Sequence, residues 1–528
     1  MRLLNPARWL LAVFSSVVLV SAGDAATSQL FTQRFDIRSN LIQLSPPERF
    51  GLFRESDRIS IQTASDAKVH VFTLRGETVY EGRSGKLPAL AVNHYFVETD
   101  GDRTQFAILP NNYHGATFLG TEADSGGDIQ FSQKLEQIQP AWVRTGAGQW
   151  SVAEAQRGVW NWTAMDKVIA ANAGRKIIIY AGDTLPLWVN STNLLVRYTQ
   201  FIQALANRYK NQLTAIEVWN EPWYNKFPDT TNLDTFVAFY LQLVSQARQA
   251  VKAINPSIQV IGPAWNSIVR GESLAMTNNL GLFDGWSWHD YGHGTYAPDQ
   301  DYGAPDWVPI LETNRLDFYF GSFATQKPLL VDELGLYGQS ALGITNTTTD
   351  PVYRSNLDWY HGMCRAIKTT VMYRAAGVEA LIPHVLALFN QVPRSPNLEV
   401  YGWDASTDRV TAPRGPHPKT SAFLMTCHWL NGTHLIGRRV LSDGTFLYAW
   451  RSADEKPFVI AWCKEGHSTP LAMTFTDFFG RELKTNTLGE EPVMIRFEKQ
   501  QDPEKVLDLV VAAMASKRPD ADPPSVGR

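Results

Sequence analysis

The feature that most constrains the fold is a series of short apolar runs that alternate with amphipathic helical stretches between residues 113 and 420. The eight runs are 116–120, 141–146, 176–182, 215–221, 258–264, 285–291, 328–333 and 380–387. Helical periodicity fills most of the gaps, for example over 195–210 and 233–255. Strands that alternate with helices indicate βαβ units and a parallel sheet. Eight such units predict an α/β protein with a (β/α)8 TIM barrel, whose active site lies at the carboxyl ends of the strands.

Strand-like sequence flanks this predicted barrel on both sides. Residues 27–112 contain short strand candidates separated by Gly, Asp, Asn and Pro, which is typical of a small β-sandwich. Strand candidates return over 421–500 and predict a C-terminal β-module. Residues 501–528 combine a short apolar helix candidate with an end rich in Pro, Asp and Ser, so we expect a disordered tail.

Residues 1–26 have the composition of a secretory signal peptide. Arg2 and Arg8 precede an apolar segment from Trp9 to Ala22, and small residues follow this segment. The rival interpretation is an uncleaved membrane anchor, but the segment is shorter than the roughly 20 residues that cross a bilayer. We therefore expect cleavage and a secreted or periplasmic mature protein with no membrane-spanning segment.

Composition excludes several function classes. A net charge of -4 and a pI near 6.3 argue against a nucleic-acid partner, which usually meets a basic surface. The cysteines Cys364, Cys427 and Cys463 are too far apart for a dense disulfide framework or a close-spaced zinc site. No metal-binding motif, phosphate loop or nucleophilic serine elbow is present, so we expect no metal and no cofactor.

Two acidic residues lie at the ends of predicted strands. Glu221 ends the fourth run, in Trp219-Asn220-Glu221-Pro222, and Glu333 ends the seventh. Retaining hydrolysis of a glycosidic bond requires two carboxyl groups about 5 Å apart, one donating a proton and the other attacking the anomeric carbon. The sequence therefore predicts that Glu221 is the acid/base and Glu333 the nucleophile.

Asp332 is an alternative to Glu333, because it is the neighbouring carboxylate in the same run. Neighbours along a strand point to opposite faces, and Glu333 would share its face with Val331. We take this alternation to favour Glu333, while Asp332 stays open.

Three features of these runs resemble glycoside hydrolase clan A, and within it family 39. They are a Glu preceded by Asn at the fourth strand, a His-x-Tyr pair at the sixth and a Glu ending the seventh. In this chain they are Asn220-Glu221-Pro222, His289-x-Tyr291 and Glu333. The resemblance covers about residues 117–421. Family 39 includes β-xylosidases, α-iduronidases and bacterial exopolysaccharide hydrolases, and cellulase-like family 5 is an alternative.

The resemblance also implies roles for residues around the two acids. Tyr291 would donate a hydrogen bond to the nucleophile, and His289 would border the catalytic subsite. Arg144, at the end of the second run, would lie near Glu333, although a structural ion pair would look the same in sequence. Asn220 would hydrogen-bond the sugar 2-hydroxyl. Aromatic residues in loops after the strands are candidate sugar platforms. The candidates are Trp150, Trp188, Trp223, Tyr224 and Trp265.

The sequence thus predicts an exported retaining β-glycosidase that acts on an oligosaccharide or polysaccharide. Two other functions stay open. One is a carbohydrate-binding protein on a hydrolase barrel that no longer cuts, although the presence of both acids argues against it. The other is a transglycosylase, which uses the same glycosyl-enzyme intermediate with a sugar as acceptor.

Overall fold

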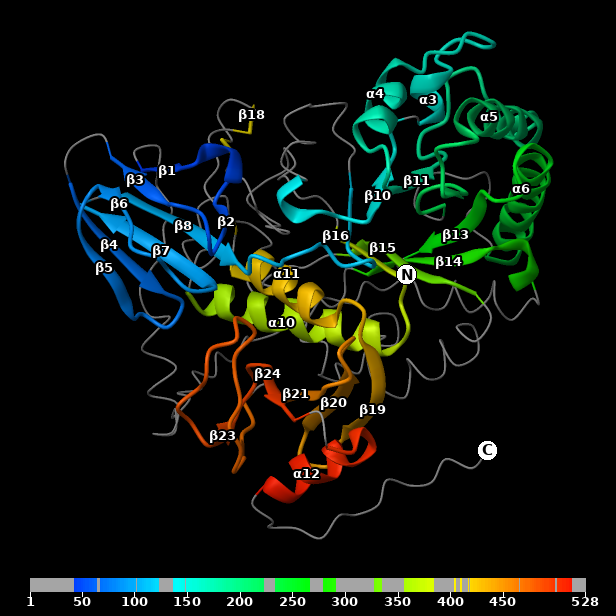
Figure 1. Cartoon of the computed structure of the whole chain (residues 1–528). Helices are drawn as coiled ribbons and strands as arrows, with labels where there is room; N and C mark the ends of the chain where they lie inside the picture. The colour runs from blue at the N-terminus through cyan, green and yellow to red at the C-terminus, as the bar shows by residue number, and fades with distance from the viewer. Residues whose placement is uncertain are drawn as a thin grey trace, which may run out of the picture.

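The computed structural model of the chain describes most of the barrel and both flanking regions (Figure 1). The residues described are 42–63, 67–100, 102–122, 136–147, 149–222, 233–265, 279–290, 327–334, 356–383, 403–404, 409–410, 416, 418–464, 466–498 and 501–514. No helix among these residues is long and apolar enough to cross a membrane.

An eight-stranded parallel sheet forms the centre of the molecule, with the strand order β16-β15-β14-β13-β12-β11-β10-β9. A parallel bridge between Leu119 and Leu381 joins the two ends of the sheet, so the sheet closes into a barrel. This confirms the predicted (β/α)8 fold. The strands are β9 (Gly120–Glu122), β10 (Trp142–Thr145), β11 (Lys176–Tyr180), β12 (Ala215–Glu217), β13 (Gln259–Trp265), β14 (Gly285–Asp290), β15 (Leu329–Leu334) and β16 (Ala380–Pro383).

Helices cover the outside of this barrel. The two longest that sequence periodicity predicts lie within a residue or two of the expected bounds, as α5 (Leu194–Tyr209) and α6 (Leu233–Ile254). The other helices of this region are α3 (Trp150–Ala153), α4 (Thr163–Ala171), α10 (Asn356–Ala375) and α11 (Pro418–Leu430). The predicted domain boundary between residues 420 and 421 falls inside α11, which lies beside α10 (Figure 1).

Two strands differ from the predicted runs. The first run, 116–120, is mostly a turn, in which the Leu119 amide donates to the Ala116 carbonyl, and β9 begins only at Gly120. The fourth run was expected to reach Glu221, but β12 ends at Glu217. The chain leaves the extended conformation there, because Trp219 and Glu221 have positive φ angles of 70° and 42°.

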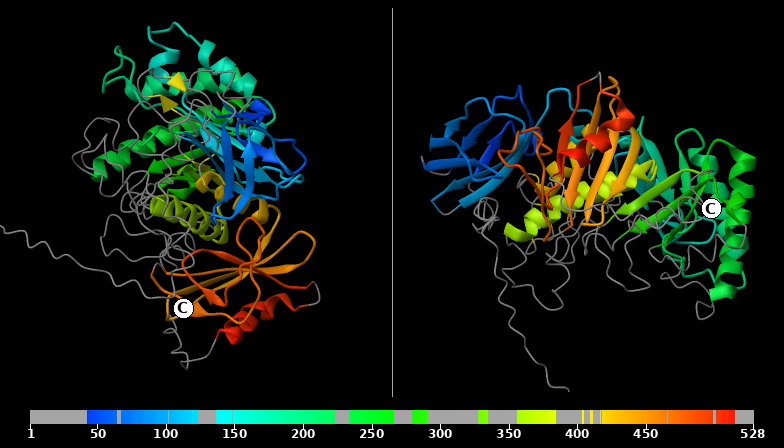
Figure 2. Two further views of the ribbon diagram at one scale, coloured as in Figure 1. Left: turned by 90° about the vertical axis from the view of Figure 1, so that its left-hand side faces the viewer. Right: turned by 90° about the horizontal axis from the view of Figure 1, so that it is seen from below.

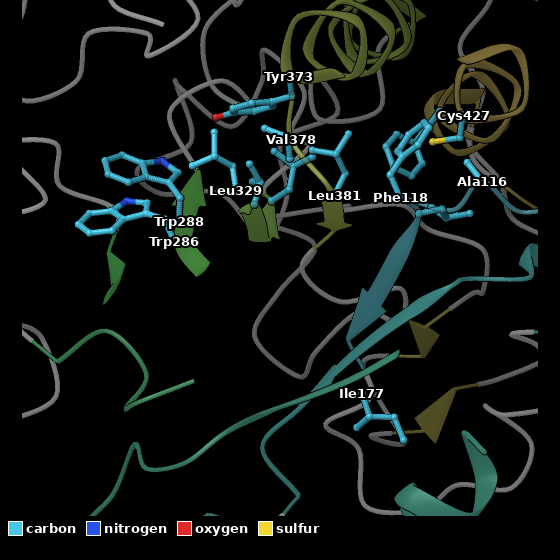
Figure 3. Close-up of a cluster of buried hydrophobic side chains, with 14 of the residues drawn as sticks. Ala116, Phe118, Ile177, Trp286, Trp288, Leu329, Tyr373, Val378, Leu381 and Cys427 are labelled. Carbon is cyan, nitrogen blue, oxygen red and sulfur yellow. The ribbon is translucent and has the colours of Figure 1, made fainter. Parts of the chain in front are cut away.

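Alternation along the strands separates two apolar layers. Side chains that point outward pack against the helices, and Figure 3 shows Trp288, Leu329 and Leu381 on the side of the strands that faces Tyr373 of α10. Side chains that point inward form a separate cluster inside the barrel. Its members are Trp142, Ile178, Ala215, Ile261, Leu330, Ala380 and Ile382. This inner cluster is the floor beneath the site described below.

The N-terminal region forms two sheets that share one apolar core. A five-stranded sheet has the order β2-β8-β7-β4-β5, and a three-stranded sheet has the order β1-β3-β6. Ile61 from the smaller sheet and Val71 and Phe106 from the larger one belong to the same buried cluster, as expected of a sandwich. The strands are β1 (Gln43–Ser45), β2 (Leu52–Arg54), β3 (Ser60–Gln62), β4 (Lys68–Thr73), β5 (Thr78–Arg83), β6 (Gly85–Lys86), β7 (Asn93–Thr99) and β8 (Asp102–Leu109).

The C-terminal region is an antiparallel sheet with the order β19-β20-β21-β24 and a short pair, β22-β23. Figure 2 shows this module, in orange and red, apart from the barrel strands. Its strands are β19 (His434–Val440), β20 (Thr445–Arg451), β21 (Pro457–Cys463), β22 (Thr469–Pro470), β23 (Thr487–Leu488) and β24 (Val493–Arg496). Residues 501–514 include the short apolar helix candidate of the predicted tail. They contain α12 (Val506–Ala513), whose Val506 and Val510 are buried in the core of the module.

Buried ion pairs connect the two flanking regions. Arg75, just after β4, forms an ion pair with Glu491, and its Nε lies 3.5 Å from an oxygen of Asp477. Burial raises the pKa of Asp477 to about 6, and the nearby Arg75 only partly offsets this. These contacts hold the N-terminal sandwich against the C-terminal module.

Candidate active site

A polar layer lies directly above the apolar floor of the barrel. Arg144, Tyr180, Glu217 and Asp332 each follow an inward-facing floor residue by two positions, so alternation turns them to the same inner face. Glu122 lies at the end of β9, and a hydrogen bond from Arg144 places it in the same layer. Charged side chains are almost never fully buried unless they are paired. Each charge of this layer therefore needs a partner inside the barrel.

Arg144 is the centre of this layer, with only 1% of its surface exposed. Its Nε and Nη2 donate to the two oxygens of Glu217 at 2.9 and 2.7 Å, which is a bidentate pair. Its Nη1 donates to Glu122 Oε1 at 2.6 Å and to Glu333 Oε2 at 3.0 Å. The guanidinium also stacks over the Tyr180 ring, 4.4 Å from the ring centre. One fixed cation therefore orients three carboxylates, and Glu333 is one of them.

The pairing of Arg144 with Glu217 determines which of these groups are charged. Burial alone would lower the pKa of Arg144, but Glu217 and the other carboxylates outweigh it and raise that pKa well above its ordinary value. Burial alone would raise the pKa of Glu217, but Arg144, a hydrogen bond with Asp332 and the nearby His289 together outweigh burial, and the pKa is lowered. Arg144 is thus a permanent cation, and Glu217 is its ionised partner.

His289 connects Arg144 with both predicted catalytic acids. Arg144 Nη2 lies 3.1 Å from His289 Nε2, and a guanidinium has only donors. An N–H at Nε2 would point at this donor, so we place the ring proton on Nδ1. Nδ1 lies 2.9 Å from Glu221 Oε1 and 3.3 Å from Glu333 Oε2. The imidazole is the Nδ1–H tautomer, and it points its proton toward the pair of acids.

Glu221 and Glu333 come together at the mouth of the barrel. One oxygen of each, together with His289 Nδ1 or Nε2, forms a set of atoms that all lie within 4.8 Å of one another. The side chain of Glu221 is 20% exposed, whereas that of Glu333 is 8% exposed and therefore almost buried. The structure thus brings the carboxyl groups of the two predicted acids close to each other at one end of the barrel.

The backbone around Glu221 is in an unusual conformation. Trp219 and Glu221 adopt positive φ angles that side chains other than glycine rarely accept. Asn220 lies between them, and its Oδ1 accepts from Arg144 Nη2 at 2.6 Å. Such strain is concentrated at functional sites, where the surrounding structure holds it in place. The Asn220 contact is one such restraint, since it fixes this turn to Arg144.

A β-bulge places Glu333 inside the barrel. Val331 pairs with Trp288 and Glu333 pairs with His289, so β15 has one more residue than β14 across this stretch. The register against β16 shifts at the same place. Val331 belongs to the layer under the helices, so simple alternation would turn Glu333 outward and Asp332 inward. The prediction that alternation favours Glu333 was therefore wrong in its reasoning, because the extra residue brings both side chains inward.

Two groups of described residues have donor atoms at a spacing that could hold a metal ion. They are Glu217, His289 and Asp332, and Glu221, His289 and Glu333. Arg144 contacts the first group through Glu217 and the second through Glu333. The guanidinium already neutralises these oxygens, and its charge repels a second cation. The residues of the barrel mouth therefore fit an acid pair better than they fit a metal.

The structure describes only some of the remaining predicted site residues. Trp188 is half-buried, packs edge-on against Trp150 and donates its indole N–H to the Glu154 carbonyl at 3.0 Å. Its role as a sugar platform stays a prediction. Trp223 and Tyr291 lie outside the described residues, as does Tyr224.

Glu122 and Glu217 were not identified from the sequence. Each is a carboxylate in a strand that is otherwise buried, with 2% and 0% of its surface exposed. A charged residue inside a buried parallel strand needs a partner in the barrel interior. That requirement is the signal that would have connected both residues with Arg144.

Comparison with solved structures shows what this fold is similar to. One is a family 39 glycoside hydrolase from the gut symbiont Bacteroides cellulosilyticus WH2, with a TM-score of 0.64 and 15% identity, covering 87% of this chain and 100% of that chain. Another is a GH39 β-xylosidase from Caulobacter crescentus, with a TM-score of 0.42 and 19% identity, covering 67% of this chain and 79% of that one. The catalytic domain of GH30 xylanase C from Talaromyces cellulolyticus has a TM-score of 0.46 and 12% identity, covering 73% and 98%.

The first of these structures confirms the predicted resemblance at the level of the fold. Its coverage extends beyond the barrel, so the likeness includes flanking β-domains as well. No protein-family profile matches the sequence, and no curated protein matches it.

Proposed function

We propose that the chain is a retaining glycoside hydrolase that cleaves β-glycosidic bonds in an oligosaccharide or polysaccharide by double displacement. The observation that carries this proposal is the approach of Glu221 and Glu333 at the mouth of the barrel, where their nearest oxygens lie within 4.8 Å. Retaining enzymes hold their two carboxyl groups about 5–5.5 Å apart, whereas inverting enzymes separate them by about 6.5–9.5 Å to admit a water.

Glu333 is the nucleophile in this proposal. Arg144 Nη1 donates to Oε2 at 3.0 Å, which favours the ionised carboxylate that attack requires. The carboxylate attacks the anomeric carbon and forms a glycosyl ester as the bond to the leaving oxygen breaks. Water then attacks the same carbon, and the ester bond to Glu333 breaks.

Glu221 is the acid/base. It donates a proton to the leaving oxygen in the first step and removes one from the attacking water in the second. His289 Nδ1–H donates to Oε1 at 2.9 Å, so Oε1 is the accepting oxygen of the carboxylic acid. The acidic proton is therefore on Oε2, the oxygen that faces the leaving group in this proposal.

Asn220 and the aromatic residues would bind the sugar. Arg144 Nη2 donates to Asn220 Oδ1, and this contact orients the amide so that its nitrogen points away from Arg144. We propose that this nitrogen donates to the sugar 2-hydroxyl. Trp188, Trp223 and Tyr291 complete the proposed sugar-binding set, with Tyr291 donating to Glu333 as the family resemblance implies.

The proposal includes export of the protein. Residues 1–26 would direct the chain out of the cytoplasm and be removed, which places the mature enzyme in the periplasm or outside the cell. A polysaccharide too large to enter a cell is then accessible as a substrate. The double displacement itself uses the two carboxyl groups and water.

Product stereochemistry tests this proposal. The purified protein is incubated with aryl β-glycosides and with soluble and bacterial polysaccharides, and the first product is followed by ¹H NMR before mutarotation. We expect the β-anomer to appear first. An initial α-anomer would contradict the proposal, and binding to a polysaccharide without any product would indicate the non-catalytic alternative. Products that are longer than the substrate, detected by mass spectrometry, would indicate transglycosylation.

A further inference from the structure

Asp332 is a fully buried carboxyl group beside the proposed nucleophile, and it has an unusual environment. None of its surface is exposed, and no N–H or O–H donor of another described residue lies within hydrogen-bond distance of either side-chain oxygen. Its nearest cationic group is Arg144, whose Nε lies 3.8 Å from Oδ2. An ionised carboxylate in a protein interior normally accepts several hydrogen bonds. The surroundings of Asp332 do not supply them.

The group that Asp332 does face is Glu217. An oxygen of Asp332 and an oxygen of Glu217 belong to a set of atoms that lie within 4.8 Å of one another. Glu217 is the ionised partner of Arg144 and can only accept. Two ionised carboxylates this close would repel each other, whereas a carboxylic acid beside a carboxylate forms a strong O–H···O⁻ hydrogen bond. Burial first, and Glu217 second, raise the pKa of Asp332 well above its ordinary value.

We propose that Asp332 is a neutral carboxylic acid that shares its proton with Glu217 and acts as a positioning residue for Arg144 and Glu333. The role of Glu333 rests on the proposed function, whereas the protonated state of Asp332 rests on the geometry of the buried layer alone.

The other groups around Asp332 are consistent with this state. They are Arg144 from β10, Glu217 from β12, Tyr240 from α6, His289 from β14 and Glu333 on its own strand. Arg144 is the only cation among them. Its N–H groups already donate hydrogen bonds to Glu217, Glu122, Glu333 and Asn220. An ionised Asp332 would compete for this guanidinium, whereas a neutral one leaves Nη1 directed at Glu333.

The pH dependence of stability tests the protonated state. Above about pH 4 the unfolded chain ionises Asp332, while the folded protein keeps its proton, so the wild-type protein loses stability as pH rises. Asp332→Asn places a neutral group of the same size at this position and removes that loss. We therefore expect the unfolding equilibrium constant of the wild type, divided by that of Asp332→Asn, to increase by up to tenfold per pH unit between pH 5 and 8 in urea titrations.

Asp284→Asn is the matched control. Asp284 lies just before β14 and pairs with Arg248 at 2.6 Å and Lys252 at 2.7 Å. Burial would raise its pKa, but these two cations and the Val260 N–H that donates to Asp284 together outweigh burial and lower it. Asp284 is then ionised in both the folded and the unfolded chain between pH 5 and 8. The unfolding equilibrium constant of the wild type, divided by that of Asp284→Asn, should therefore stay constant over this range.

The opposite outcome for Asp332→Asn would overturn the proposal. If Asp332 were an ionised partner of Arg144, the variant would be less stable than the wild type by a constant factor from pH 5 to 8. Infrared spectroscopy provides a second measurement. In a Glu221→Gln background at pH 8, we expect the C=O stretch of a protonated carboxyl group, and this band disappears when Asp332→Asn is added.

The infrared measurement does not depend on how well the Asp332 variant folds. Absence of any protonated carboxyl band in the Glu221→Gln protein at pH 8 overturns the proposal by itself. Neither measurement requires turnover. A protein with these pH and infrared properties but no hydrolysis would refute the proposed function and leave the inference on Asp332 intact.

Discussion

The Glu333→Gln variant is expected to lose hydrolysis almost completely. The amide keeps the size of the side chain and a hydrogen bond from Arg144, but it cannot form the glycosyl ester. Removing the nucleophile of a hydrolase that acts through a covalent intermediate costs on the order of 10⁴- to 10⁶-fold in kcat. Initial rates on an activated aryl β-glycoside measure this loss, and changing the leaving group should not restore the activity.

Glu379→Gln is the control for this variant. Glu379 is exposed and lies just before β16, at the end of the barrel opposite to the proposed site. The same chemical change there should leave kcat/KM unaltered. Wild-type rates in Glu333→Gln would refute the assignment. If Asp332→Asn were inactive at the same time, the result would indicate that Asp332 is the nucleophile.

The Glu221→Ala variant is expected to show a loss that depends on the substrate. Loss of general acid catalysis costs about 10²- to 10⁴-fold when the leaving group is a sugar or another poor leaving group. A dinitrophenyl leaving group needs no proton, so formation of the glycosyl-enzyme should stay close to the wild-type rate. Burst kinetics with a dinitrophenyl glycoside and steady-state rates with a natural linkage measure the two cases.

Azide provides the second half of this test. The glycosyl-enzyme of Glu221→Ala lacks the base that activates water, so it accumulates and KM falls. Azide is an anion that attacks without a base, and it should accelerate turnover and give a glycosyl azide with retained configuration. Glu333→Gln offers no intermediate for azide to attack. Equal losses of Glu221→Ala on good and poor leaving groups, without azide rescue, would contradict an acid/base role.

Sequence periodicity was sufficient to predict the barrel. Seven of the eight runs overlap most of a parallel strand, because strands that are buried on both faces read as short continuous apolar segments. The first run was misplaced because Phe118 and Leu119 are buried in a turn before β9. Burial and strand geometry produce the same apolar signal, so a single sequence does not separate them.

The closeness of Glu221 and Glu333 was predicted from motif positions, but the reason for their geometry was not. Alternation alone would turn Glu333 outward, and an extra residue in β15 reverses this. Bulges depend on the register between strands, which the sequence of one strand does not encode. Glu221 is similar, since it lies four residues beyond β12, in a turn where Trp219 and Glu221 have positive φ angles that the apolar pattern does not predict.

The arrangement of charges beneath Glu221 and Glu333 was the part of the site that the sequence predicted least. Arg144 was expected near Glu333, and the structure places it there, but the same guanidinium also binds Glu217 and Glu122. These contacts connect β9, β10, β12 and β15, and no local pattern relates residues on four separate strands. The consequence for Asp332, a buried acid that is neutral, follows only when all of these partners are known.

Mass spectrometry of a trapped intermediate tests the central claim most directly. A 2-deoxy-2-fluoro β-glycoside with a good leaving group slows hydrolysis of the glycosyl ester, so the sugar should accumulate on the protein. After proteolysis, the account predicts a single sugar adduct on the carboxyl group of Glu333, and no adduct in Glu333→Gln. An adduct on Asp332 or Glu221, or turnover of the aryl glycoside without any adduct, would contradict it.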